Sequence, residues 1–114
     1  MARQYNCGLD AAMDVIGGKW KALILWALHT EELRFGELRR AVTGISEKML
    51  IQQLREMESR KIVHREVFRQ VPPKVVYSLT PLGRSLNEAL LPLGAWGQDN
   101  VELLESTAAR EPAA

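Results

Sequence analysis

The segment TGISEKMLIQQLREMES, residues 43–59, decides the fold. Ser46 is a strong N-cap residue, and Ile45 and Leu50 occupy the N′ and N4 positions of a hydrophobic staple around it. The apolar side chains that follow recur at i, i+4 and i+7, and they are Leu50, Leu54 and Met57. The sequence therefore predicts a helix that begins after Ser46 and buries one stripe.

The outer side of this helix carries long polar side chains. At about 100° per residue, the positions opposite the apolar stripe are Lys48, Gln52, Arg55 and Ser59. Ile51 flanks that outer face, and the turn before the helix, residues 43–45, is very short and contains a glycine. A preceding helix, a short turn and a second helix with polar side chains outward form a helix-turn-helix. An ordinary solvated helix face is the alternative.

Three shorter helices are predicted ahead of this segment by apolar spacing. The first ends at Gly17-Gly18, and its expected buried stripe is Leu9, Ala12, Met13 and Ile16. The second covers about residues 19–29, and its stripe is Trp20, Leu23, Ile24, Ala27 and Leu28. Residues 33–35 are expected to be extended. The third is closed by Gly44, and its stripe is Phe35, Leu38, Ala41 and Val42.

After this helix in the sequence, β-branched and aromatic residues predict strands over 63–69 and 75–80. The connection, Gln70-Val71-Pro72-Pro73-Lys74, indicates a hairpin with a rigid tip that holds Arg69 and Lys74 on either side. This hairpin is the wing of a winged helix. Thr80 and Pro81 are an N-cap and an N1 proline, and they open a helix in which Pro92 should produce a kink. The inward positions expected in that helix are Leu82, Leu86, Leu90 and Leu93.

The C-terminal stretch contains more apolar side chains than one small core can cover. They are Leu90, Leu91, Leu93, Trp96, Val101, Leu103 and Leu104. Gly94 and Gly97 would permit close approach of another helix, so we expect this region and the first helix to form the interface of a homodimer. Closure over the chain's own core is the alternative, and for Trp20 and Trp96 a core position is expected. One domain over residues 1–105 and a frayed tail over 106–114 follow.

Charge is distributed unevenly along the 114 residues, although the net charge is only +1. Between Arg34 and Lys74 lie ten basic and five acidic side chains, net +5, and the rest of the chain is net −4. This basic island favours a polyanionic partner. Cys7 is the single cysteine, and with two histidines the sequence offers no metal-ligand cluster, no disulfide framework and no catalytic pairing. We expect no enzyme activity, no cofactor, no membrane contact and a cytoplasmic location.

Taken together, these residues resemble the HxlR family, a branch of the MarR-like winged-helix transcription regulators. The resemblance spans about residues 7–105. It is carried by GGKWK (17–21), LIL (23–25), RF (34–35), EL (37–38), IS (45–46), LR (54–55), PP (72–73), Val75, YSLTP (77–81), Gly83 and WG (96–97). It implies a mostly helical α+β winged helix-turn-helix with a two-stranded wing and terminal dimerisation helices. It also implies that the residue 46–59 helix enters the major groove of an operator, and that the cysteine before the first helix senses electrophiles or oxidants.

The chemistry of individual side chains between Arg34 and Lys74 predicts how they would contact double-stranded DNA. Lys48 and Arg55 match guanine acceptors and Gln52 matches adenine, while Ile51 could cover a thymine methyl group. Ser46 caps its helix and is placed to donate to a phosphate. The expected phosphate contacts are Arg34, Arg39, Arg40, Arg69 and Lys74. For Arg65, two roles stay equally open: a phosphate contact, or an ion pair with Glu66 or with an acidic residue of the residue 46–59 helix.

Cys7 is the predicted sensor because the start of a helix favours a thiolate, the form that attacks electrophiles and peroxide. Asp10 and Asp14 oppose this effect. Since no second cysteine follows, the products would be an adduct, a mixed disulfide or a Cys7–Cys7 bridge across the dimer, in response to a reactive small-molecule signal. Three alternatives remain: an inert buried thiol, a winged-helix module that binds proteins, and a regulator switched by a non-covalent ligand.

Overall fold

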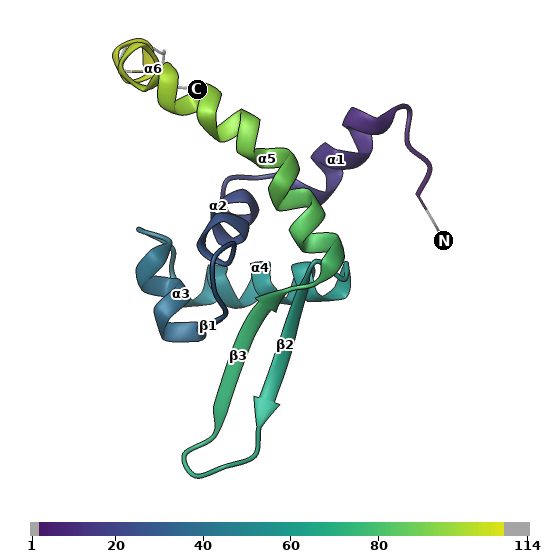
Figure 1. The fold of residues 1–114 in the computed structure, drawn as a ribbon, viewed down its shortest axis with the longest axis vertical. Coiled ribbons are helices and arrows are strands. Elements are labelled where there is room, and N and C mark those ends of the chain that lie inside the picture. Colours follow the sequence, from purple (N-terminus) through teal and green to yellow (C-terminus); the bar gives the residue numbers. More distant parts are fainter. Residues whose placement is uncertain (1–2, 109–114) are drawn as a thin grey trace.

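The computed structural model describes residues 3–108 and contains six helices and three strands over that range (Figure 1). The elements are α1 (Gly8–Ile16), α2 (Trp20–Ala27), β1 (Leu33–Arg34), α3 (Phe35–Ala41), α4 (Glu47–Ser59), β2 (Val63–Phe68), β3 (Lys74–Leu79), α5 (Pro81–Asp99) and α6 (Val101–Ala108). The β2–β3 hairpin projects from one end of the molecule, and α1, α5 and α6 lie toward the other. The predicted mostly helical α+β winged helix-turn-helix is confirmed.

The wing hairpin continues into a small antiparallel sheet of order β1-β3-β2. Val63 pairs with Leu79 at its base and Phe68 with Lys74 near its tip. The predicted extended residues 33–35 supply the third strand, because Leu33 and Arg34 pair with Tyr77 and Val76 on the other edge of β3. The wing is therefore joined by backbone hydrogen bonds to the start of α3.

The core lies between α2, α3, α4 and the base of the sheet. The predicted inward stripe of α4 is confirmed, since Leu50, Leu54 and Met57 are at most 2% exposed. The predicted stripe of α2 needs a correction: Leu23 is 44% exposed, whereas Leu25, outside the stripe, is fully buried. The reason is that α2 packs against α3, α4 and α5 on different sides, so one stripe does not describe its buried surface.

The first helix does not bury the expected stripe. Leu9 is 71% and Met13 is 52% exposed, and α1 contains no buried residue. Only the end of α1, at Val15 and Ile16, packs against the core. The spacing thus identified an amphipathic helix correctly, but among residues 3–108 of one protomer no element covers its apolar side.

In α5 the predicted inward leucines divide into two groups. Leu86 and Leu90 pack against the core, whereas Leu82 and Leu93 are more than half exposed, as is Trp96. The helix continues through Pro92 to Asp99 and extends beyond the core, so none of the described elements covers its second half (Figure 1). Helix α6 continues to Ala108, so residues 106–108 of the tail that was expected to fray are helical, and residues 109–114 lie outside the described residues.

The junction between β3 and α5 is closely packed. Thr80 caps α5 as predicted: its hydroxyl accepts from the Gly83 backbone N–H at 3.0 Å and donates to the Lys61 carbonyl at 2.6 Å. The Thr80 backbone N–H donates to the Ile62 carbonyl at 3.1 Å. Gly83 packs so tightly here that a Cβ atom on it would lie 2.1 Å from the Ile62 carbonyl oxygen. A glycine is therefore required where the wing meets the long helix.

Candidate nucleic-acid interface

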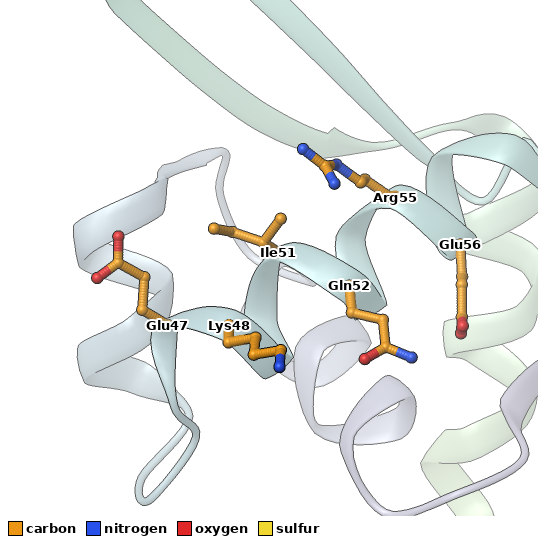
Figure 2. Close-up of a pocket in the computed structure, with 6 residues that line it drawn as sticks. All are labelled: Glu47, Lys48, Ile51, Gln52, Arg55 and Glu56. Atoms are coloured by element: carbon orange, nitrogen blue, oxygen red, sulfur yellow. The ribbon is translucent and has the colours of Figure 1, made fainter.

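The outer face of α4 forms one open, concave surface, shown in Figure 2. Four predicted site residues line it together with two glutamates, and the set is Glu47, Lys48, Ile51, Gln52, Arg55 and Glu56. All are exposed except Ile51, which is half-buried. Because the opposite side of the same helix lies in the core, this face is rigidly presented to a partner.

The start of α4 is fixed by its cap. The Ser46 hydroxyl accepts from the Met49 backbone N–H at 3.1 Å, as the sequence predicted. Ile45 and Leu50, the pair expected to form the staple, are both buried. Gly44 has φ +88°, a conformation that L side chains rarely adopt, and it allows the sharp turn between α3 and α4. This turn sets the angle at which α4 follows α3.

The arginines of α3 lie beside this turn. Arg39 and Arg40 line a second concave surface together with Gly44 and the exposed Gly36. An ion pair of 3.8 Å between Arg39 and Glu47 connects α3 to the first turn of α4. Arg34 caps α3, and its backbone N–H donates to the Glu37 carboxylate at 2.8 Å. Three predicted phosphate contacts thus lie around the helix-turn-helix.

The two cations of the wing are separate from the helix-turn-helix. Arg69 follows β2 and is exposed, and Lys74 begins β3. The Lys74 ammonium lies over the Phe68 ring, 5.2 Å from its centroid, and this contact holds it near the tip. Val71 between them is fully exposed. The wing projects away from α4 in Figure 1, so these charges can reach only a partner that extends well beyond α4.

Arg65 lies between these two regions. It pairs with Tyr77 across the strands, and both line a hollow between the sheet and α4 together with Arg55 and Glu58. Within residues 3–108, no acidic side chain lies within ion-pairing distance of Arg65, so the expected pairing with Glu66 or a glutamate of α4 is not found. Arg65 therefore extends the basic surface from α4 toward the wing.

Sequence reasoning missed one contact made by the outer face of α4. The Lys21 ammonium on α2 lies 2.7 Å from the Glu56 carboxylate and donates to the Gln53 carbonyl at 2.8 Å. The hydrogen bond and the positive charge of Lys21 lower the pKa of Glu56, and a hydrogen bond from Gln52 adds to this effect. Gln52 and Glu56 are one helical turn apart and could have been paired from the sequence, but Lys21 is 35 residues from Glu56.

The segment that carries Cys7 is attached to the far end of α4. Arg60 donates to Asp14 of α1 and to the Tyr5 hydroxyl, both at 3.2 Å, and the Tyr5 hydroxyl donates to Asp14 at 2.7 Å. The Tyr5 hydrogen bond, with help from Arg60 and Arg3, lowers the pKa of Asp14. Cys7 itself is exposed, which corrects the alternative of a buried thiol, and it occupies the N-cap position of α1.

Many large apolar side chains are exposed on α1, on the second half of α5 and on α6; together they are called the apolar surface. Its exposed members are Leu9, Met13, Leu91, Leu93, Trp96, Val101, Leu103 and Leu104. Trp96, for which a core position was expected, is 56% exposed here, whereas Trp20 packs against the core. Trp26 stacks on His29 and borders a groove with Leu91 and Gly94. So many large apolar side chains exposed on three helices are typical of a surface that binds a partner.

No helix among the described residues has the length and apolar character needed to cross a membrane. In the part of the chain that the structure describes, no three histidine, cysteine or acidic side chains are grouped to hold a metal ion.

Comparisons with known proteins agree on one family. The family model for HxlR-like helix-turn-helix proteins matches residues 15–105. An HTH-type transcriptional regulator of Bacillus subtilis, YybR, is 48% identical over 101 residues, which cover 89% of this chain and 81% of the relative. The redox regulator HypR in its reduced form superposes with a TM-score of 0.81 at 47% identity, covering 88% of this chain and 99% of HypR. Diamide-treated YodB from B. subtilis superposes with a TM-score of 0.70 at 33% identity, covering 84% and 96%.

Proposed function

The chain belongs to the HxlR-like helix-turn-helix family of transcription regulators, and from this we propose that it is a homodimer that reads a specific two-part DNA site through α4. The observation that carries the proposal is the division of α4 into two faces. Leu50, Leu54 and Met57 fix the helix in the core, and the opposite face offers Lys48, Gln52 and Arg55 on one open surface. A helix held in this way can enter a major groove without rearranging the domain.

The remaining cations suit the DNA backbone. Arg39 and Arg40 lie beside the turn that precedes α4, where phosphates flank an inserted helix, and Ser46 and the first turn of α4 offer an anion-binding helix start. Arg69 and Lys74 would contact the backbone one step further along, from the wing. Phosphate contacts position the protein and contribute affinity, whereas the α4 side chains distinguish bases.

A dimer supplies the second copy of α4 that a two-part DNA site requires. Helices α1, α5 and α6 carry large apolar side chains that remain exposed in the part of the chain that the structure describes. A Cβ atom added to Gly94 or Gly97 on α5 would meet no described atom within 4 Å outside its own helix backbone. A partner helix can therefore approach the backbone there. A symmetric pair formed through this surface places two copies of α4 at a fixed separation, which is how a dimer reads two half-sites.

The test is a base-preference profile. A pool of duplexes with a randomised central segment is enriched on the unmodified protein, and the enriched duplex and its single-base variants are then bound by Gln52→Ala and Arg55→Ala. Each variant should lose about 1 to 3 kcal/mol of discrimination at one base pair per half-site and keep it elsewhere. Thermal unfolding should be unchanged, because both side chains are exposed.

The matched control is Glu88→Ala on α5, away from the proposed DNA surface, which should leave the profile as it is. Unchanged profiles for both α4 variants would contradict the orientation proposed for α4. A failure to enrich any sequence, together with affinity that does not fall as salt rises, would favour the protein-binding module instead, because phosphate contacts make DNA affinity strongly salt-dependent.

We further propose that Cys7 switches DNA affinity by reacting with an electrophile or oxidant. Its exposure at the N-cap of α1 supports this proposal, as does the likeness to HypR, which is described as a redox regulator. The Tyr5–Asp14–Arg60 contacts supply a path, because they connect the residues on both sides of Cys7 to the end of α4. A quinone would form a carbon–sulfur bond with the thiolate and take up a proton, with no second cysteine required.

Cys7 is tested by treating the unmodified protein and Cys7→Ser with a quinone, then measuring intact mass and affinity for the enriched duplex. The unmodified protein should gain one adduct mass per protomer and change its affinity, and Cys7→Ser should do neither. Equal affinity before and after a confirmed adduct would make Cys7 a bystander. The groove beside Trp26 and Leu91 would then be the place to look for a non-covalent ligand.

A further inference from the structure

Glu56 is out of place on a surface meant for DNA. It lines the same concave face as Lys48, Gln52 and Arg55, where a free carboxylate would repel phosphates. The structure offers a compensation from another helix: the Lys21 ammonium lies 2.7 Å from Glu56, and the Lys21 side chain is only 15% exposed. A second hydrogen bond, to Gln53 at 2.8 Å, fixes the position of Lys21 between α2 and α4. The Glu56 charge is thus neutralised from behind the face.

The arrangement has a second consequence, for Gln52. Gln52 lies one turn before Glu56, and Figure 2 shows the two side chains together on the same face. In Figure 2 the Gln52 amide turns its nitrogen toward Glu56 and its oxygen away, so an N–H group faces the Glu56 carboxylate and can form a hydrogen bond with it. Because a glutamine amide has two N–H groups and one carbonyl oxygen, this bond leaves one donor and one acceptor for a partner. That pair of groups is the pattern that matches the N7 and N6 edge of adenine in the major groove.

Without Glu56 the amide of Gln52 has no fixed orientation. A glutamine side chain that is free to flip presents its donor and acceptor in either order, and only one order matches adenine. A carboxylate accepts hydrogen bonds and cannot donate them, so it selects the order in which the Gln52 N–H group faces Glu56. Lys21 in turn keeps the carboxylate in place.

From these contacts we propose that Glu56, held by Lys21, is a positioning residue that orients Gln52 to read adenine. The proposal rests on the proposed function, since it assumes that α4 enters a major groove, and it adds two residues that would never touch a base. An ion pair between surface side chains contributes little to stability, so orientation is the larger effect expected from this one.

The experiment uses the full chain and the duplex enriched on the unmodified protein, with single-base variants of that duplex. Gln52→Ala first locates the base pair that Gln52 reads. Glu56→Ala and Lys21→Met are then compared with Glu58→Gln, a matched control that removes a carboxylate from the side of α4 that faces Arg65 and Tyr77. Lys21→Arg is the conservative variant, which keeps the positive charge. Thermal unfolding is measured for every variant.

We expect Glu56→Ala and Lys21→Met to reduce discrimination at the Gln52 base pair by about fivefold or more, while discrimination at the Arg55 base pair is kept. Glu58→Gln should strengthen binding to all duplexes alike without altering the profile, and Lys21→Arg should retain it. A merely structural role would lower the unfolding temperature and weaken all duplexes together.

Three outcomes would be decisive against the proposal, and they are distinguishable. Unchanged discrimination at the Gln52 pair in Glu56→Ala would show that Gln52 needs no support, and the proposed function would stand. No effect of Gln52→Ala on any base pair would remove the premise that Gln52 reads a base. If the unmodified protein enriches no sequence at all, the proposed function itself fails, independently of Glu56.

Discussion

Replacing Gly83 by alanine should destabilise the domain strongly, although alanine is the better helix former. The added Cβ would lie 2.1 Å from the Ile62 carbonyl oxygen, and ordinary contacts begin at 3.4 Å, so the two must separate by about 1.3 Å. The Ile62 oxygen also accepts from the Thr80 N–H at 3.1 Å, and that movement weakens this bond. Overpacking costs about 1 to 3 kcal/mol and the lost bond about 1 kcal/mol.

The helix propensity of alanine offsets about 1 kcal/mol of this, which leaves a net loss of about 1 to 3 kcal/mol. For a domain of this size the unfolding temperature should fall by about 5 °C or more, as measured by circular dichroism at one protein concentration. The control is Gly36→Ala in α3, where the new Cβ would meet only the tip of the Arg40 side chain at 3.6 Å. That variant should be neutral or slightly stabilised. If both variants unfold at the same temperature as the unmodified protein, the close approach of α5 to Ile62 does not exist.

Three further predictions concern the wing, the apolar surface and the α1 contacts. Lys74→Ala should weaken all DNA sequences alike and reduce the slope of log affinity against log salt by about one unit per protomer, as measured by fluorescence anisotropy; a change confined to one base pair would contradict it. Leu93→Asp with Val101→Asp should give monomers or aggregates in light scattering, and a folded monomer of the unmodified protein at micromolar concentration would refute the dimer. Asp14 has a lowered pKa when folded, so its contribution to stability is present above its ordinary value of 3.8 and is lost as pH falls below it. Asp14→Asn should therefore lower the urea midpoint at neutral pH but not in acid, and an equal difference at both pH values would contradict this.

Local signals in the sequence were sufficient for α4 and its surroundings. The Ser46 cap, the staple and the apolar stripe all act within a few residues, and the structure places each as predicted. The site residues on α4 follow from the same helix geometry. The wing was also identified correctly, because paired prolines between two β-branched runs leave few other structures.

The apolar spacing did not predict which element covers each apolar stripe. Leu9 and Leu93 have the spacing of inward residues, yet both are exposed, because the apolar pattern does not state whether the covering element belongs to the same chain. Lys21 was missed for a related reason. Its partner Glu56 is 35 residues away, and only the packing of α2 against α4 brings them together. Contacts of this kind have no signature in a single sequence.

The two-faced construction of α4 separates two kinds of mutation that many proteins cannot separate. Lys48, Gln52 and Arg55 are exposed, so under the proposed function exchanging them should change the preferred operator at little cost to folding. Gene duplication could therefore give copies that read different promoters through a handful of substitutions on one unchanged scaffold. The same separation makes the domain suitable for engineering, because a library confined to these positions and Ile51 would sample new DNA specificities while most of its members still fold.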